Sequence, residues 1–473
     1  MPPLPRSATH LAVLLALAAL SAPPSLSASD ENLSQTIIDL QTAALADSTA
    51  IDLLRSLTAD VGSRFAGTPG DIAAVTWAEQ KMRQLGFTNV RTEPVTVPRW
   101  VRGEARGHIV GPHPLRMMLI ALGGSVGTPD DGITAEVVAV DSLESLDALP
   151  GDALNGKIVF FNQRMERARD GSGYGRTVGI RTKGAAAAAR KGAIATLIRS
   201  VGTGTHRFPH TGQMRYEEGT RRIPAAALAI PDADVLETRL AANQPVVFNL
   251  FLGSRYLDET ESANVIGEIE GREETDEIVL LGAHLDSWDV GHGAIDDGAG
   301  CATVLAAGHL LGRLSQRPRR TIRVVLFANE EFGLSGAKAY ADRHAETLDT
   351  HQLATESDFG AGRIWRFATR LDPLDLPQAE RLAPLLAPLG IDWYENTGRG
   401  GADLRPLREA GVPVADLTPD GTYYFDYHHT EDDTFDKVAP DDLAQNVAAM
   451  VSLAYFAAEI PMSFRHLPPE ETP

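Results

Sequence analysis

The chain has 473 residues, of which 43% are hydrophobic, so it can bury a large core and is not a disordered polypeptide. Its 63 acidic residues outnumber its 43 basic residues, and the formal net charge of −20 disfavours binding to nucleic acid or anionic lipid. Cys301 is the single cysteine, which excludes an internal disulfide and a cysteine-rich structural zinc site.

The N-terminus has the pattern of a secretory signal peptide. Arg6 is the only charged residue among the first 28, and an apolar run at 11–20 and a stretch of small residues follow it. The run is too short to span a bilayer, and no later apolar run reaches about 20 residues. We predict a signal peptide at 1–28, no membrane anchor, and a protein exported to the periplasm or secreted.

Two segments with helical periodicity come next, at 28–47 and 71–87, and a strand-like run follows at 89–97. Near residue 107 the composition changes to glycine, proline and short apolar runs. We expect strands at 156–161, 192–199, 223–230 and 246–252, and an alanine-rich helix at 184–193. This pattern predicts a separate unit inserted before the later apolar strands.

The most informative segment is 284–300, which follows a strand-like apolar run at 277–282. His284 and Asp286 stand two residues apart at the end of this strand, so their side chains point the same way and one can ligate a cation while the other supports it. Asp296 and Asp297 open a predicted helix at 301–314, where either of them could instead cap the helix.

Three further segments carry candidate ligands. A second apolar strand ends in Glu330 and Glu331, whose side chains diverge on an extended backbone, although a solvated acidic strand end would look the same. A third short run ends in Asp358, and the acidic segment 425–434 contains His428 and His429, of which either could be a ligand. His206 and His210 are not assigned as ligands, because Pro209 disrupts the helix that would align them, and we expect an exposed loop or a substrate lid there.

The candidate ligands are too many for one tetrahedral zinc ion. They are three carboxylates and two imidazoles, namely His284, Asp296, Glu331, Asp358 and His429. Such a set suits two cations about 3.5 to 4 Å apart that share one carboxylate and a water molecule. Zinc, manganese and cobalt all accept these ligands.

The metal-site segments resemble those of the co-catalytic zinc exopeptidases, a family that includes bacterial leucyl aminopeptidases, glutamate carboxypeptidase and carboxypeptidase Q. The likeness is greatest to the carboxypeptidase Q branch and covers about residues 35–460. It is carried by 284–300, the Glu330–Glu331 pair, 356–358 and 427–434, in the family's order. The segment 151–161 also resembles the start of the protease-associated domains inserted in many of these enzymes.

The resemblance implies an α/β fold in which helices sandwich a mixed central sheet. It implies a catalytic domain formed by 29–108 and 257–465, interrupted by a β-rich protease-associated domain at 109–256. It further implies a homodimer, which the residues themselves do not show.

The resemblance also implies the role of each site residue. One zinc ion would be held by His284 and Asp358, the other by Glu331 and His429, with Asp296 bridging the two. Glu330 would be the general base, and Asp286 would orient His284. His429 is favoured over His428 because the family's last ligand precedes an Asp-Thr pair by four residues. A cis peptide would follow Asp296.

Together these observations predict an exported dizinc exopeptidase that hydrolyses dipeptides or short peptides as a carboxypeptidase or dipeptidase. Two alternatives stay open: an aminopeptidase of the same family, and a metal-binding receptor domain without hydrolytic activity. The loop that contains Arg399, Asp403 and Arg405 could recognise either a free carboxylate or a free amine.

Overall fold

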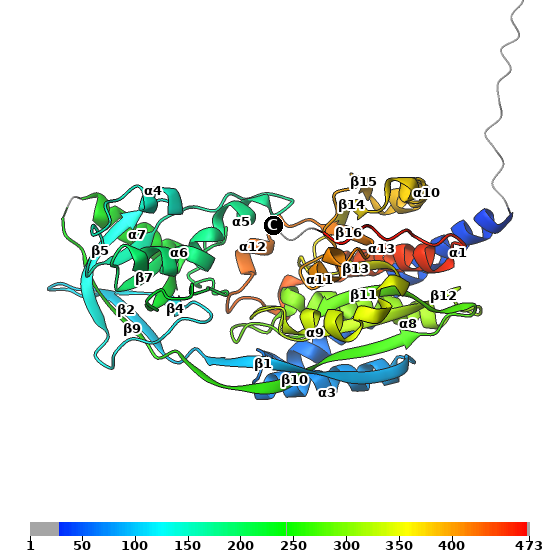
Figure 1. The fold of residues 1–473 in the computed structure, drawn as a ribbon, viewed down its shortest axis with the longest axis horizontal. Coiled ribbons are helices and arrows are strands. Elements are labelled where there is room, and N and C mark those ends of the chain that lie inside the picture. The colour runs from blue at the N-terminus through cyan, green and yellow to red at the C-terminus, as the bar shows by residue number, and fades with distance from the viewer. Residues whose placement is uncertain (1–27, 243, 471–473) are drawn as a thin grey trace, which may run out of the picture.

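Two lobes, each built around an eight-stranded sheet, make up the computed structural model, which describes residues 28–242 and 244–470 (Figure 1). The long antiparallel strands β1 (Thr88–Val101) and β10 (Arg255–Ile269) run from one lobe to the other. Apart from Ala28, the predicted signal peptide lies outside the described residues. Within the described ranges, we find no helix with the length and apolarity needed to cross a membrane.

The sheet of the first lobe is mixed, as predicted. Its strands lie in the order β1, β10, β12 (Arg320–Phe327), β11 (Glu274–His284), β13 (His351–Glu356), β16 (Val414–Pro419), β14 (Ile364–Arg370) and β15 (Asp392–Trp393). Strands β12, β11, β13 and β16 are parallel, whereas β10 and β14 join them in antiparallel orientation.

Apolar residues on both faces of β11 explain why its sequence reads as one continuous apolar run. Val279 and Leu281 pack into the core on one face of the sheet, and Ile278 and Leu280 pack into the core on the other. Helices cover both faces, which confirms the predicted sandwich.

The larger core lies beneath α1 (Ala28–Ala46), α2 (Thr49–Ser56), α3 (Pro69–Gln84), α8 (Ala299–Gly312), α10 (Leu376–Leu386) and α13 (Pro440–Glu459). The smaller core lies beneath α9 (Ser335–Arg343) and α11 (Arg405–Glu409).

The four parallel strands end at the same edge of the first sheet. β11 ends at His284 itself, β12 ends three residues before Glu330, and β13 ends two residues before Asp358. β16 leads into the short helix α12 (Tyr424–Tyr427), which precedes the two adjacent histidines. Ligands of open α/β sheets bind at such an edge.

The second lobe is built from residues between β1 and β10. Its strands lie in the order β3 (Leu115–Met117), β2 (Ala105–Ile109), β9 (Val247–Leu252), β5 (Ile133–Val140), β6 (Ile158–Phe161), β7 (Ala195–Arg199), β8 (Ala225–Leu228) and β4 (Leu119–Ala121). Its helices are α4 (Leu143–Asp147), α5 (Ser172–Thr177), α6 (Gly179–Arg190) and α7 (Ile230–Ala241).

The four strands predicted in this part of the chain are present as β6 to β9, and the alanine-rich run lies in α6. That this lobe is a protease-associated domain stays a prediction. Helix α5 of the second lobe and helix α12 of the first lobe lie where the two lobes meet (Figure 1). The second lobe therefore sits over the edge at which the parallel strands end.

Candidate metal centre

His284 lies at the centre of a first group of candidate ligands. Its Nε2 atom is 3.2 Å from Oδ1 of Asp296 and 3.4 Å from Oδ1 of Asp358. Its Nδ1 atom lies 3.1 Å from the backbone carbonyl of Asp286, which fixes the ring and leaves Nε2 to face the two carboxylates. The three ligand atoms lie within 4.8 Å of one another, close enough to share one cation.

Asp296 also faces a second group. The Nε2 atom of His429 is 3.2 Å from Oδ2 of Asp296 and 3.0 Å from Oε2 of Glu331. Oε1 of Glu331 is buried and accepts no hydrogen bond from the described residues, and Oδ2 of Asp296 is buried against the imidazoles of His428 and His429. Buried anionic oxygens without donors fit a cation. The structure thus brings all five predicted ligands together, with Asp296 between the two groups.

The geometry favours His429 over His428 as the last ligand. The two rings are stacked with their centroids 3.5 Å apart, and Nε2 of His428 lies 3.6 Å from Asp296. No ion pair joins His428 to Glu331 among the described residues, whereas His429 contacts both carboxylates. His428 lines the cavity as His429 does, and one of its ring nitrogens lies within 4.8 Å of ligand atoms of Asp296 and His429.

The two adjacent aspartates have different roles. The peptide bond between Asp296 and Asp297 is cis, as the resemblance implied. The carboxylate of Asp297 accepts hydrogen bonds from the backbone N–H groups of His284 (3.1 Å) and Gly300 (3.0 Å). Asp297 therefore holds the start of α8, as a capping residue does, and Asp296 is left to face the site.

Asp286 positions the glutamate pair. Its carboxylate accepts hydrogen bonds from the backbone N–H groups of Glu330 (2.9 Å) and Glu331 (3.4 Å). Its Oδ1 atom is 3.6 Å from Nδ1 of His284, farther than its own carbonyl, so the predicted orientation of His284 comes mainly from the backbone. The expectation that β12 extends to the glutamates is wrong, because Asn329 has a φ of 56° and turns the chain.

Arg64 is a positioning residue that the sequence did not reveal. Its buried guanidinium donates hydrogen bonds to the carbonyls of Leu285 (2.5 Å), His292 (2.8 Å) and Gly293 (2.9 Å). These bonds fix the loop between β11 and Asp296. Arg64 lies more than 200 residues before this loop, and no local pattern marks it.

Mutual proximity raises the pKa of several site residues in the metal-free protein. Burial raises the pKa of Glu331 to about 7 and, together with neighbouring carboxylates, raises the pKa of Glu330 well above its usual value. Burial lowers the pKa of His429, but the carboxylates of Glu331 and Asp296 together outweigh it and raise the value to about 9. Bound cations would relieve this crowding of acidic groups.

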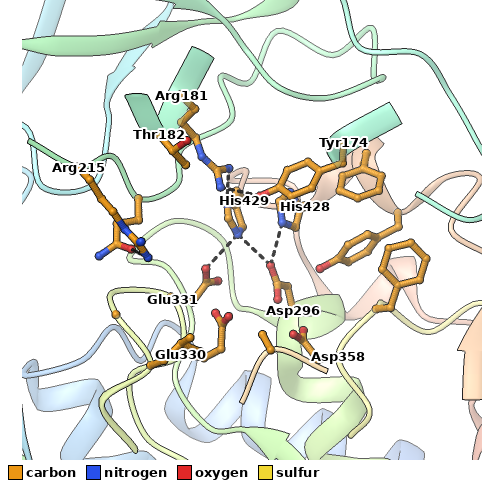
Figure 2. A pocket seen from close by; sticks show the side chains of 17 residues that line it. Tyr174, Arg181, Thr182, Arg215, Asp296, Glu330, Glu331, Asp358, His428 and His429 are labelled. Carbon is orange, nitrogen blue, oxygen red and sulfur yellow. Dashed lines mark hydrogen bonds and ion pairs between the residues drawn. The ribbon is translucent and has the colours of Figure 1, made fainter. Parts of the chain in front are cut away.

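A cavity of about 320 Å³ opens above the two groups, between the lobes (Figure 2). The first lobe contributes Asp296, Glu330, Glu331, Asp358 and His429 among others, and the second contributes Tyr174, Arg181, Thr182, Gln213 and Arg215. Of the loop expected to recognise substrate, Ala402 reaches the cavity wall, whereas Asp403 is fully buried beside Glu356.

The loop around His206 and His210, expected to be exposed or to form a substrate lid, is exposed only in part. His206 is exposed and pairs with Asp432. His210 is buried, and its Nδ1 atom lies 2.7 Å from the carbonyl of His428. The loop therefore packs against the histidine segment of the first lobe.

The sequence profile of peptidase family M28 matches residues 264–454, which include every predicted site residue. Carboxypeptidase Q of Homo sapiens is 35% identical over 435 residues, which are 92% of this chain and 90% of that protein. The chain belongs to peptidase family M28. This finding confirms the predicted family and makes the protein a metallopeptidase.

Solved structures agree with this assignment. The crystal structure of a peptidase M28 precursor from Shewanella amazonensis SB2B is similar to this M28 peptidase, with a TM-score of 0.91 and 48% identity, and the match covers 93% of this chain and 100% of that one. BSAP, a zinc aminopeptidase from Bacillus subtilis, has a TM-score of 0.63 at 21% identity, with 87% and 95% of the two chains covered. The latter likeness shows the shared fold.

Proposed function

We propose that this M28 peptidase is a dizinc exopeptidase that hydrolyses dipeptides or short peptides. One observation carries the proposal: two ligand groups share Asp296 beside Glu330 at the floor of one small cavity. His284 and Asp358 would hold one cation, and Glu331 and His429 the other. The names of carboxypeptidase Q and of the Bacillus subtilis zinc aminopeptidase support zinc and peptide hydrolysis, although Mn²⁺ or Co²⁺ would suit the same ligands.

Glu330 is suited to move the proton in this reaction. Bound divalent cations acidify water and polarise a carbonyl group. Glu330 lines the cavity without being one of the proposed ligands, so its carboxylate is free to accept the proton of the attacking water and then to donate it to the leaving amine. Asp286 holds the Glu330 backbone in place for both steps.

The second lobe favours substrates with a free carboxylate. Arg181 and Arg215 are the cationic residues among the described residues that line the cavity, and Arg215 forms no ion pair with any described residue. Glu330 would act as the base, and Asp296, Glu331 and Asp358 as ligands, so the described residues that line the cavity include no further carboxylate to bind a free amine. Arg215 therefore supports the carboxypeptidase or dipeptidase reading over the aminopeptidase alternative.

Replacing Arg215 by Met should raise KM for dipeptides with a free C-terminus by about 10- to 100-fold and leave kcat nearly unchanged, because a charge-assisted hydrogen bond made in both ground and transition states is lost. Steady-state kinetics with a dipeptide and its C-terminal amide measure this effect. The control is Arg222→Met, an exposed arginine outside the cavity. An equal effect of Arg215→Met on the amide would contradict carboxylate recognition.

The proposed function is tested with a panel of dipeptides that have free, N-blocked or C-blocked ends, assayed with and without chelator. Chelator-sensitive cleavage that requires the free carboxylate would support the proposal. Cleavage of C-terminal amides that requires only a free amine would make the protein an aminopeptidase. A metal-loaded protein that cleaves none of them would favour the receptor alternative.

Metal should leave the site as the pH falls below about 6. Binding requires neutral imidazoles, and the His429 pKa of about 9 in the metal-free protein means that protons compete with the cation throughout the neutral range. The apparent affinity should fall about tenfold per pH unit for each proton displaced. Elemental analysis after dialysis between pH 8 and pH 4 measures this release, and stoichiometric metal at pH 4 would refute the ligand set.

We also infer export and a homodimer, on different grounds. The N-terminal sequence pattern supports export, and the resemblance to the exopeptidase family supports the dimer. N-terminal sequencing of the mature protein tests the first, with a start near residue 29 expected. Light scattering of the purified protein tests the second.

A further inference from the structure

The last predicted ligand is held by the second lobe. The backbone N–H of Thr211 donates a hydrogen bond to the carbonyl of His429 at 2.9 Å, and the carbonyl of Thr211 lies 3.3 Å from Nδ1 of His429. The Nδ1 atom of the neighbouring His210 ring lies 2.7 Å from the carbonyl of His428. Residues 210 and 211 thus pair with residues 428 and 429 across the lobe boundary.

His429 depends on such support because its backbone is strained. Its φ of 62° lies in the left-handed region, which residues with a Cβ atom seldom adopt. Strained residues persist where the surrounding structure holds them, and they concentrate at functional sites. Thr211 supplies a hydrogen bond to the backbone and another to the ring of this residue.

The carbonyl of Thr211 also favours the tautomer of His429 that can bind a cation through Nε2. Nε2 of His429 faces Asp296 and Glu331, so an imidazole that binds a cation there must carry its proton on Nδ1. The Thr211 carbonyl is positioned to accept that proton in a hydrogen bond. This contact is the kind of outer partner that orients metal-bound histidines.

Arg181 lies beside His429 and Tyr174 (Figure 2) and keeps the Thr211 carbonyl in place. Arg181 is 6% exposed, and its Nη1 atom donates a hydrogen bond to the Thr211 carbonyl at 3.4 Å. Nη1 also lies 3.3 Å from Nδ1 of His429, but a guanidinium can only donate, so this contact is not a hydrogen bond when Nδ1 carries the proton. The Nη2 atom of Arg181 donates to the hydroxyl of Tyr174 at 2.5 Å. Gly212 leaves room for this packing, since a Cβ atom there would lie 2.3 Å from Nη1 of Arg181.

Among the described residues, no hydrogen bond from the second lobe holds His284, the histidine of the first ligand group. The contacts that hold His284 come from Asp286, Asp297 and Cys301, which all belong to the first lobe. The two halves of the centre therefore differ in their support. His284 is held by residues of the first lobe, whereas His429 is held by contacts from the second lobe.

We propose that Arg181 is a positioning residue through which the second lobe controls occupancy of the metal site formed by Glu331 and His429. This proposal rests on the proposed two-metal function. The cation at His284 and Asp358 binds independently of the second lobe, whereas the other binds tightly only when Arg181 and the Thr211 carbonyl hold His429.

The test is a metal titration of the full-length protein with Zn²⁺ by calorimetry and with Co²⁺ by visible absorption. In Arg181→Met, the metal affinity of the site formed by Glu331 and His429 should fall about 10- to 100-fold, the usual effect of removing a residue that orients a metal ligand. The affinity of the site formed by His284 and Asp358 should not change. The Co²⁺ spectrum of this variant should shift at one metal equivalent only. The control Arg190→Met removes an exposed arginine of the same helix, α6, and should change neither site.

Tyr174→Phe provides a second test that disturbs packing less, because it removes only the acceptor for Arg181, and it should weaken the same site by a smaller factor. Arg181→Lys should restore part of the lost affinity. The proposal would be overturned by a folded Arg181→Met protein in which both metal affinities are intact or both are reduced equally. If Arg181→Met does not fold, unchanged metal binding in Tyr174→Phe would overturn it. A wild-type protein that binds fewer than two cations would instead overturn the proposed function.

Discussion

Glu330→Gln should lower kcat by about 10²- to 10⁴-fold, the usual contribution of a general base, while both metal equivalents stay bound. The amide keeps the shape of the side chain but cannot accept the proton of the attacking water. Glu330 is not among the proposed ligands. Its backbone N–H donates a hydrogen bond to Asp286, and this bond does not involve the Glu330 side chain that the substitution changes. Turnover should therefore fall in this variant while the metal content stays at the wild-type value.

Steady-state kinetics and elemental analysis of the same preparations measure the two quantities. Glu331→Gln serves as the comparison, because Glu331 contacts His429 at 3.0 Å and its replacement should release one metal equivalent. Glu346→Gln changes an exposed glutamate on the first lobe and should affect neither quantity. If Glu330→Gln and Glu331→Gln lost metal equally, the division between base and ligand would be wrong.

The parts of the fold that follow a local pattern were predictable. The run at 277–282 is apolar on both faces because β11 is buried on both faces, and the polar residues begin where that strand ends. Since parallel strands end at one edge, candidate ligands that follow separate strands had to meet there. This reasoning predicted one shared cleft, and in the structure Nε2 of His284 lies 3.4 Å from Oδ1 of Asp358 although 74 positions separate the two residues.

The contacts that hold the site in shape were not predictable in the same way. Arg64 donates to three backbone carbonyls, and Arg181 packs against the Thr211 carbonyl. Every residue has a backbone carbonyl that can accept a hydrogen bond, so the sequence does not indicate to which carbonyl a distant arginine donates. The burial of His210 was not predictable from the sequence, because it depends on how the second lobe packs against the first.

Asp296→Asn should lower the metal affinity of both sites by more than about 10²-fold each. Even the loss of a residue that only orients a ligand lowers metal affinity by up to about 10²-fold. Oδ1 of Asp296 faces His284, and Oδ2 faces His429, each at 3.2 Å. The amide would keep the side-chain volume but remove the negative charge shared by the two groups, and its NH₂ would oppose a cation. Peptidase activity should fall with the metal.

Metal titrations distinguish this bridging role from that of an ordinary ligand. Glu331→Gln should weaken one site and leave the other at wild-type affinity, whereas Asp296→Asn should weaken both. Asp297→Asn is less suitable as a control because the Asp297 carboxylate holds the His284 backbone, so an exposed aspartate such as Asp349 is the better comparison. An Asp296→Asn protein that still bound one cation at wild-type affinity would show that Asp296 belongs to a single site, and the shared-carboxylate arrangement on which the proposed mechanism depends would have to be abandoned.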